Sequence, residues 1–512
     1  MSLKSIQEHL KLDKELLWLF LALLVVLPIY FWNVFSYSLP LGYAGMFTQM
    51  ASQIAEMNFR LPAEIPFYGP GGVPFSYPPL ALYILAIPIK LTGKYFFFLR
   101  WLPPLFSLIA LIPAYYLGLK LTNSTMAAFA SVILIASSMT FYVAHSWAAG
   151  IVRALAFCLA LLAVLLFFHY LETDSRKYQI ASGVVLGLLA MTHLEYIVFA
   201  VLWVGFWGLW QRDIKKGFWD TVIPLSIGFG VALLWIVPML SRYGIGVFVN
   251  ALHSHDNTSF LKIIGSKDEF IEFIFRQFAL LSPAGIFVFF LLVGFFWFRQ
   301  EKHKLLVFYF IVVFFLAGTK FSLLIGSFIV AAGMAYLFEK TNFFLLHTKL
   351  TARYGNFVLN IVFLFILSLF WREAFSTVKN FHPKIDSQTL YLATEISKQA
   401  APDEKYLALV VQDEAEWFPF LFQRTPITAQ WGSEWLGTYD EQSAIMAAFR
   451  DCRGKENFTC VENQFRILHE TPTHLVTYLE DKKLNFEIDQ ALEWEKIYEN
   501  KRYILWQRRT VE

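Results

Sequence analysis

Residues 59–80 read FRLPAEIPFYGPGGVPFSYPPL and are denser in proline, glycine and aromatic side chains than a regular helix or strand tolerates. The stretch follows the first strongly apolar segment of the chain, so we expect a long loop between membrane segments. Such loops are more often functional surfaces than linkers. The role of this loop therefore depends on the side of the membrane on which it lies and on what else lies there.

The composition indicates a membrane protein. The 512 residues are 57% hydrophobic and 16% charged, with a mean hydropathy of +0.52, whereas soluble domains carry roughly 25% charged residues. The net charge of +3 is too small to indicate a nucleic-acid partner. Three cysteines are too few for a disulfide framework.

The distribution of Lys and Arg predicts the topology. Lys4, Lys11 and Lys14 flank the first apolar run, 16–32, which places the N-terminus in the cytoplasm and the loop 35–77 outside. A topology with about eleven membrane spans in total places every dense cluster of Lys and Arg on the cytoplasmic side. Residues 78–90 are apolar but too short for a span, so we interpret them as a re-entrant or juxtamembrane helix on the outer side. The ten later spans are expected at 97–119, 126–143, 148–170, 180–192, 197–210, 222–240, 271–298, 305–316, 321–338 and 357–370.

Two domains are expected. Residues 1–371 form an α-helical polytopic membrane domain with a large first outer loop at 35–96, and residues 372–512 form an extracytoplasmic α/β domain. In the tail, a helix capped by Asp386 or Ser387, two buried strands and a terminal hairpin are expected at 386–399, 406–411, 474–479 and 494–507. Cys452 and Cys460 form either a local disulfide or two separate thiols.

Under this topology the unusual polar side chains converge on the outer side. Ionisable groups at membrane depth are costly and usually face a cavity or a partner, so we take these residues as candidate site residues: Glu56, Arg60, Tyr77, His145, Arg153, His193, Glu195, Arg242, His255 and Asp256. Each has a plainer explanation as well. Arg153 could extend to the interface, the pair His193 and Glu195 could make an interhelical hydrogen bond, and the other charges could be solvated. The YGPGG turn at 68–72 lacks the Lys and Ser/Thr of a nucleotide-binding loop, so it is expected to be a turn.

The arrangement resembles the GT-C superfamily of membrane glycosyltransferases. Tyr77-Pro-Pro-Leu80, behind a large outer loop, is similar to the Pro-Pro-Leu motif of the protein mannosyltransferases and the lipid A aminoarabinose transferase. Residues 43–61 and 68–80, Thr192-His-Leu-Glu195, and the pair Glu416-Trp-Phe-Pro419 and Gly432-Ser-Glu-Trp435 are similar to bacterial GT-C-like proteins. The resemblance covers the membrane half well and the tail loosely.

The resemblance implies transfer of a sugar from a polyprenyl-phosphate carrier to an extracytoplasmic acceptor, in a bacterial-type inner or cell membrane. Such chemistry needs a carboxylate to take the acceptor's proton and cationic groups for the leaving phosphate. Members of the superfamily usually carry an Asp early in the first outer loop, but residues 35–77 contain none. Glu56 is therefore our candidate base, with Glu195 or Asp256 as alternatives.

Arg153 or Arg242 is the candidate phosphate contact, and His193 with Glu195 would shape the pocket. A divalent metal stays open as a cofactor, membrane lipid and the lipid-linked sugar are the expected partners, and the oligomeric state is open. Two other functions are considered. One is a non-catalytic GT-C-like protein that binds or presents a lipid-linked glycan. The other is a transporter, which the lack of a detectable internal repeat disfavours.

Overall fold

The computed structural model describes residues 3–69, 72–211, 213–254, 284–300, 304–316, 318–346 and 355–509. The chain divides into two compact units. Unit 1 comprises residues 1–37, 100–235 and 259–381, and unit 2 comprises residues 38–99, 236–258 and 382–512. The sequence-based limits instead grouped the first outer loop, 35–96, with the membrane part.

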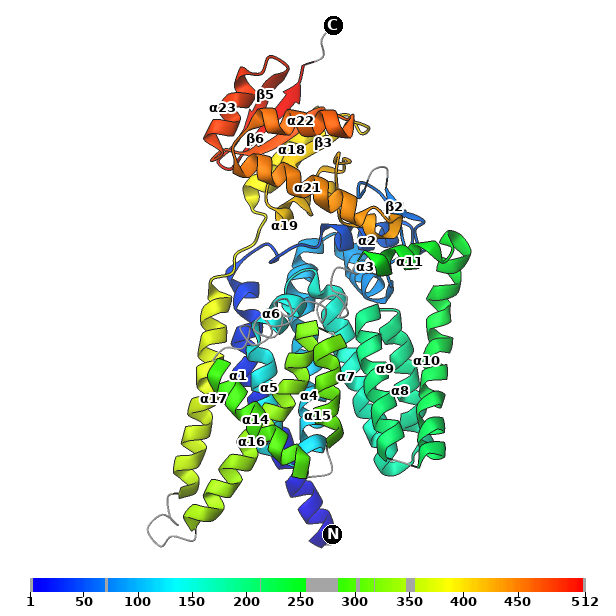
Figure 1. The fold of residues 1–512 in the computed structure, drawn as a ribbon, viewed down its shortest axis with the longest axis vertical. Helices are drawn as coiled ribbons and strands as arrows, with labels where there is room; N and C mark the ends of the chain where they lie inside the picture. Colours follow the sequence, from blue (N-terminus) through cyan, green and yellow to red (C-terminus); the bar gives the residue numbers. More distant parts are fainter. Residues whose placement is uncertain are drawn as a thin grey trace, which may run out of the picture. The chain divides into compact units, whose positions relative to one another are not determined.

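Unit 1 is helical throughout the residues described (Figure 1). Its helices pack as neighbours mainly in the pairs α14 with α16, α7 with α8, and α5 with α16. Helix α4 begins and helix α10 ends in unit 2. The bounds are α1 Leu3–Ser36, α4 Tyr95–Thr122, α5 Thr125–Ser137, α6 Met139–Ser146, α7 Gly150–Thr173, α8 Arg176–Ala190, α9 Leu194–Gln211, α10 Ile214–Tyr243, α14 Ala284–Gln300, α15 Lys304–Leu316, α16 Gly318–Leu346 and α17 Gly355–Lys379.

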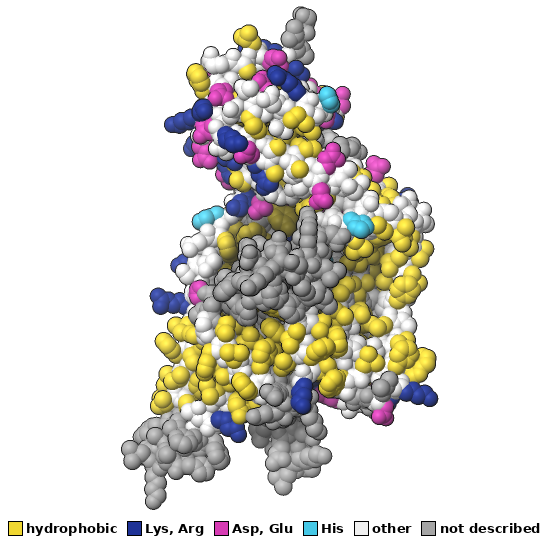
Figure 2. Space-filling view, in the orientation of Figure 1, with side chains coloured by type: hydrophobic (Ala, Val, Ile, Leu, Met, Phe, Trp, Pro, Cys, Tyr) yellow, Lys and Arg dark blue, Asp and Glu magenta, His cyan; other side chains and the backbone are white. Residues whose placement is uncertain are grey.

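Apolar helices long enough to cross a membrane confirm the polytopic class. Within the described ranges, six helices have the length and composition of a span, and the bent pair α5 and α6 would make a seventh, with an angle of 67° at the break. The expected number of about eleven also included segments that form shorter apolar helices, such as α9 and α15. Figure 2 shows hydrophobic side chains covering much of the visible surface of these helices.

Unit 2 contains the first outer loop, helix α11 and the C-terminal tail. The part predicted to be irregular includes a two-stranded antiparallel ladder, in which Glu64 pairs with Pro74 and Ile65 with Val73. The loop's two helices, α2 and α3, pack together, and α2 also contacts α20 of the tail. The bounds are α2 Gly45–Glu56, β1 Glu64–Ile65, β2 Val73–Pro74, α3 Leu80–Thr92, α11 Gly246–His253, α18 Ser387–Gln399, β3 Tyr406–Leu409, α19 Gln412–Ala415, α20 Phe418–Phe422, η2 Ser433–Leu436, α21 Tyr439–Gly454, α22 Phe458–Leu468, β4 His474–Tyr478, α23 Lys482–Gln490, β5 Trp494–Glu499 and β6 Tyr503–Arg508.

The tail is an α/β domain, as predicted. Its sheet has the order β3-β4-β6-β5, with β3 and β4 parallel and the other pairs antiparallel. Leu407, Leu475 and Trp506 on one face pack against α21, α22 and α23, which together form the hydrophobic core. On the other face Tyr503 hydrogen-bonds Thr389 of α18 at 2.8 Å. Of the two caps expected from the sequence, Asp386 is the one present, and its side chain accepts the N–H groups of Gln388 and Thr389.

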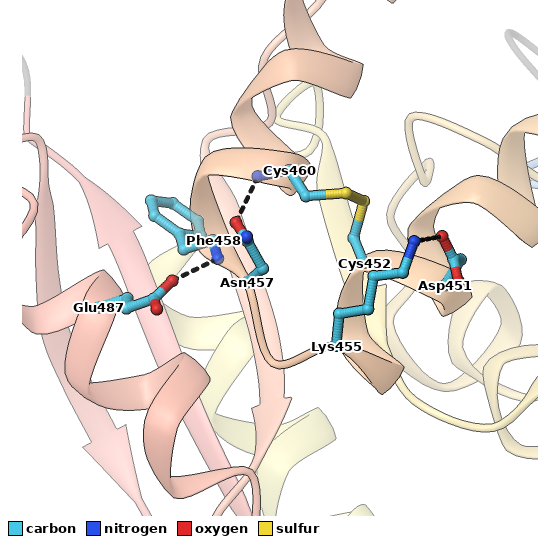
Figure 3. Close-up of a disulfide and its surroundings, with 7 residues drawn as sticks. All are labelled: Asp451, Cys452, Lys455, Asn457, Phe458, Cys460 and Glu487. Carbon is cyan, nitrogen blue, oxygen red and sulfur yellow. Dashed lines mark hydrogen bonds and ion pairs between the residues drawn. A yellow bond between two sulfur atoms is a disulfide. The ribbon is translucent and has the colours of Figure 1, made fainter.

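Of the two alternatives for the tail cysteines, the structure has the disulfide (Figure 3). Cys452 lies in the last turns of α21, and Cys460 lies in the first turn of α22. The turn between them is fixed by Asn457, whose side chain accepts the Cys460 N–H at 2.8 Å and so caps α22. Glu487 of α23 accepts the N–H of Phe458 at 2.7 Å. The disulfide therefore joins two helices of the core at a point where the chain already turns tightly.

Candidate functional site

Four of the predicted site residues lie together in unit 1, around Tyr196. His145 lies in the last turn of helix α6, Arg153 in the first turn of α7 and Glu195 in the first turn of α9, and His193 precedes α9. The His193 ring lies 5.1 Å from the Tyr196 ring, in an edge-to-face arrangement. The chain does break between α8 and α9, at 191–193, so His193 and Glu195 are not on one continuous helix. We call His145, Arg153, His193, Glu195, Tyr196 and Lys320 the Tyr196 cluster.

His145 holds Tyr196 in place. Its Nδ1 lies 2.8 Å from the carbonyl oxygen of Phe141, an acceptor only, so Nδ1 carries the proton. Nε2 is then the acceptor for the Tyr196 hydroxyl, at 2.6 Å. The His145 ring is 2% exposed and stacks on Phe141 at 5.1 Å. Because both ring nitrogens are used within the protein, His145 orients Tyr196.

A close approach of backbones supports this geometry. Gly150, the first residue of α7, lies so near the backbone of His145 that a Cβ atom would overlap it. Ser107 of α4 adds a hydrogen bond to the His145 carbonyl at 3.2 Å. Only glycine can therefore begin α7 here, and the two helices meet tightly beside the cluster.

Lys320 lies over Tyr196 and is paired with Glu195. Its ammonium group is 4.9 Å from the centre of the Tyr196 ring and forms an ion pair with Glu195 Oε2. The Lys320 side chain is 17% exposed and that of Glu195 is 43% exposed, so the pair reaches from the protein interior towards its surface. Arg153 lies near enough to Lys320 to repel it electrostatically. Lys320 is thus paired with Glu195 while the charge of Arg153 lies close by.

Three helices begin at this cluster. Arg153 is the fourth residue of α7, Glu195 the second of α9 and Lys320 the third of α16. The first N–H groups of a helix have no partner within it and carry a partial positive charge, which favours anions. Helix N-termini and two basic side chains together make the Tyr196 cluster suited to an anion. Lys320 and Tyr196 were not among the candidate site residues taken from the sequence.

The other predicted residues that the structure describes belong to unit 2. Glu56 ends α2 and is exposed, as is Arg60. Tyr77 is half-buried between Phe47 and Trp435, with ring centres at 5.1 and 6.1 Å. Arg242 donates a hydrogen bond of 2.9 Å to the carbonyl of Pro62, so it holds the first outer loop. His255 and Asp256 lie outside the described residues.

A buried acid in unit 2 was noted in the sequence only as part of a motif. Glu416 is 2% exposed and accepts the N–H groups of Gly45 at 2.6 Å and Met46 at 2.8 Å. Burial raises the pKa of Glu416 to about 7, against the opposing effect of these two hydrogen bonds. Glu434 is similar. Burial raises its pKa to about 7, and its Oε2 has no hydrogen-bond partner in the part of the chain that the structure describes.

No group of three His, Cys, Asp or Glu side chains suited to a metal ion occurs among the residues whose placement is described. The chemistry that the described residues offer is therefore that of cations and helix N-termini in unit 1 and of buried carboxylates in unit 2.

Comparisons with protein families and solved structures show which proteins this chain is similar to. Residues 76–241 match the family model of the dolichyl-phosphate-mannose-protein mannosyltransferases. A comparison with curated protein sequences finds no match. Solved structures do match along most of the chain, and the chain has the fold of the GT-C membrane glycosyltransferases, which confirms the resemblance seen in the sequence.

Three of these structures illustrate the similarity. The oligosaccharyltransferase AglB from Archaeoglobus fulgidus, in complex with an inhibitory peptide and a dolichol-phosphate, is 15% identical, with a TM-score of 0.60 over 92% of this chain and 70% of that one. ArnT from Cupriavidus metallidurans bound to undecaprenyl phosphate is 12% identical, with a TM-score of 0.55 over 96% of this chain and 98% of that one. The mycobacterial arabinofuranosyltransferase AftD is 12% identical, with a TM-score of 0.57 over 96% of this chain and 40% of that one.

Proposed function

We propose that this chain is a glycosyltransferase that moves a sugar from a polyprenyl-phosphate carrier to an extracytoplasmic acceptor. The observation that carries the proposal is the meeting of Lys320, Arg153 and three helix N-termini in the Tyr196 cluster. A phosphate group is anionic and accepts several hydrogen bonds, so it suits this arrangement. The lipid phosphates bound to AglB and ArnT, two proteins of the same fold, support the choice of a lipid-linked phosphate.

Each residue of the cluster has a distinct role in this proposal. Lys320 and Arg153 contact the phosphate oxygens. Glu195 holds the Lys320 ammonium group in position through an ion pair, and the Tyr196 ring stabilises the same group through a cation–π contact. His145 fixes Tyr196 through the hydroxyl, and His193 forms a wall beside the same ring. The negative charge that grows on the phosphate during transfer is then stabilised by groups already in place.

The transfer itself needs one base. An acceptor hydroxyl attacks the anomeric carbon, the bond from that carbon to the phosphate oxygen breaks with its electron pair, and the hydroxyl proton passes to a carboxylate. We assign this carboxylate to Glu56, because Glu195 is already held by Lys320. Arg60 and Tyr77 remain proposed substrate contacts in the first outer loop, as do His255 and Asp256. Arg242 is better assigned to holding that loop.

The orientation follows from the same proposal. The first outer loop and the C-terminal domain are extracytoplasmic and the N-terminus is cytoplasmic, in a bacterial-type inner or cell membrane. The disulfide between Cys452 and Cys460 supports this, because disulfides persist in oxidising compartments. A membrane-impermeant reagent on intact cells should modify a cysteine introduced at Glu480, which is exposed in the tail, and should spare one introduced at Lys216.

Lipid-phosphate binding tests the proposal directly. With the protein in nanodiscs, Lys320→Met and Arg153→Gln should each weaken binding of undecaprenyl phosphate by roughly 10- to 100-fold, as expected for loss of a charge-assisted hydrogen bond. Lys216→Gln is the matched control, because Lys216 pairs with Asp174 on the protein surface away from the cluster. Unchanged binding in both cluster variants would contradict the proposal.

A second function, binding or presenting a lipid-linked glycan without transfer, is favoured by one observation. Residues 35–77 contain no Asp, and Glu56 is exposed. A labelled polyprenyl-phosphate sugar separates the two functions. Turnover that Glu56→Gln abolishes, with binding unchanged, supports the transferase and its base. Binding of the donor by the wild-type protein with no turnover for any acceptor supports the second function.

A further inference from the structure

A pocket lies at the free edge of the tail sheet. It encloses about 540 Å³, including space open to solvent, and its lining includes β3, Thr428, Trp431 and the inner side of α21. Every residue of the lining belongs to the C-terminal part of unit 2, and none of them belongs to the Tyr196 cluster.

The pocket exists because a neighbouring segment leaves the edge of β3. The N–H and C=O groups of Tyr406 bond Thr425 and Ile427, which run parallel to β3. The segment then diverges, because the Thr428 hydroxyl and the Ala429 N–H both donate to Gln442 Oε1 of α21, at 2.9 and 3.1 Å. A gap opens beside β3 beyond that point.

Backbone hydrogen-bonding groups face this gap. The Lys405 carbonyl accepts the Thr473 N–H at 2.9 Å beside β4, and in a parallel pair every second residue bonds the same neighbour. The N–H and C=O groups of Ala408 therefore point to the free edge, into the pocket. They offer one donor and one acceptor, which is too few for an added strand but enough to orient a small polar ligand.

The pocket also carries a positive charge and an indole ring. Arg450 of α21 donates to Gln412 Oε1 at 2.7 Å and makes no ion pair with any acid in the described ranges. Its neighbour Arg453 is neutralised by Asp481, with Nε to Oδ2 at 2.7 Å, and lies over the Tyr478 ring. Of the two arginines that line the pocket, Arg450 is thus the one whose positive charge is available to a ligand. The half-buried Trp431 also lines the pocket.

We infer that this pocket binds a saccharide unit that carries a carboxylate, such as a uronic acid. The Arg450 guanidinium matches the fork of a carboxylate. The Trp431 ring, whose face is electron-rich, packs against the C–H groups of a pyranose. Ala408 and Gln412 bind hydroxyls. The site is a second glycan-binding site in the tail, and the choice of a saccharide over another carboxylate rests on the proposed glycosyl transfer.

Binding of simple glycosides to the full chain in nanodiscs tests the inference without any lipid donor. Isothermal titration should show binding of methyl β-glucuronide and at least tenfold weaker binding of methyl β-glucoside and of inorganic phosphate. Arg450→Gln should weaken glucuronide binding at least tenfold. Arg466→Gln is the matched control, because Arg466 is also exposed on a tail helix but does not line the pocket.

Three results would overturn the inference: no glucuronide binding, equal binding of glucoside and glucuronide, or unchanged binding by Arg450→Gln. Phosphate competing as strongly as glucuronide would replace the saccharide by a general oxyanion and overturn it as well. Because the assay contains no polyprenyl-phosphate sugar, these results are independent of the transfer assay. Glucuronide binding can therefore be found without any transferase activity, and transferase activity can be found without glucuronide binding.

Discussion

The carboxylate of Glu416 caps helix α2 at Gly45, a residue 371 positions earlier in the chain. Helix α2 begins without a side-chain cap of its own, since Ala44 occupies that position. Both Glu416 oxygens accept from its first turn, and the Tyr68 hydroxyl donates to the Glu416 carbonyl at 2.9 Å. The first outer loop is therefore anchored to the tail through one buried acid, which explains why the two group into one unit.

Removing this acid should loosen unit 2. Glu416→Ala leaves two buried N–H groups without an acceptor and should destabilise the protein by about 1–3 kcal/mol per lost partner. Glu416→Gln keeps one acceptor and should cost less. Thermal unfolding followed by tryptophan fluorescence measures the change. Glu441→Ala, at an exposed position, is the control and should shift the midpoint little. Equal midpoints for Glu416→Ala and this control would refute the capping role.

Glu416 also predicts a pH dependence. Its pKa is about 7 in the folded protein and about 4.5 when unfolded, because burial disfavours the charged form. The unfolded chain ionises first as pH rises, so the stabilisation present below pH 4.5 is lost between pH 4.5 and 7, by roughly 3 kcal/mol. Glu434 contributes in the same direction. Thermal midpoints measured from pH 5 to 8 should fall, and Glu416→Gln should flatten part of that fall. An unchanged slope in Glu416→Gln would contradict the assignment.

Space at Gly45 is a further requirement of the cap. A Cβ atom there would lie 2.5 Å from the Glu416 carbonyl oxygen and 2.6 Å from the Tyr68 hydroxyl. Gly45→Ala should therefore destabilise unit 2 by about 1–3 kcal/mol, the usual effect of overpacking a core. Gly454→Ala is a matched control, because no atom lies within 4 Å of the added methyl group and the midpoint should stay or rise slightly. Thermal unfolding of the two variants side by side checks the prediction.

The sequence predicted the fold class better than the contacts between distant parts of the chain. Apolar runs are local patterns, so they predicted the membrane helices and the tail strands. Clusters of Lys and Arg are local as well, and they predict the side of the membrane on which a loop lies. The Glu416 cap depends on two segments 371 residues apart, and no local pattern shows it. The break between α5 and α6 also lies inside a continuous apolar run, 126–143.

The candidate site was predicted in part for the same reason. His145, Arg153, His193 and Glu195 stand out because ionisable side chains at helix ends are rare in apolar sequence, and the structure brings them together. In the sequence Tyr196 resembles any aromatic residue at a membrane interface. Its role becomes apparent only from the hydrogen bond between its hydroxyl and His145 Nε2 in the structure. Arg242 was chosen for the same reason as Arg153, as an ionisable side chain at a helix end in apolar sequence. Its guanidinium instead donates a hydrogen bond to the carbonyl oxygen of Pro62.

The buried network around Glu414 should be essential to the tail. Glu414 has no exposed surface and accepts the hydroxyls of Tyr503 and Tyr478 together with the Arg502 guanidinium. Arg502→Met leaves a buried acid without its cation and should destabilise the tail by about 3–5 kcal/mol. The double variant Arg502→Met/Glu414→Gln should recover part of that loss, because it also removes the charge. Arg508→Met, in an exposed ion pair with Glu493, should cost under about 1 kcal/mol. Equal losses in Arg502→Met and Arg508→Met would contradict the network.

The Tyr196 hydroxyl should matter for donor binding more than for folding. Tyr196→Phe removes the hydrogen bond to His145 Nε2 but keeps the ring under Lys320. We expect about tenfold weaker binding of undecaprenyl phosphate, since a buried acceptor is left unpaired and the cluster loses its fixed geometry. Tyr196→Leu also removes the ring that stabilises the ammonium group, so it should weaken binding further. Tyr391→Phe, at an exposed tyrosine of the tail, is the control. If Tyr196→Phe lowers the thermal midpoint but leaves lipid-phosphate binding intact, Tyr196 supports only the fold and has no role in positioning the cations.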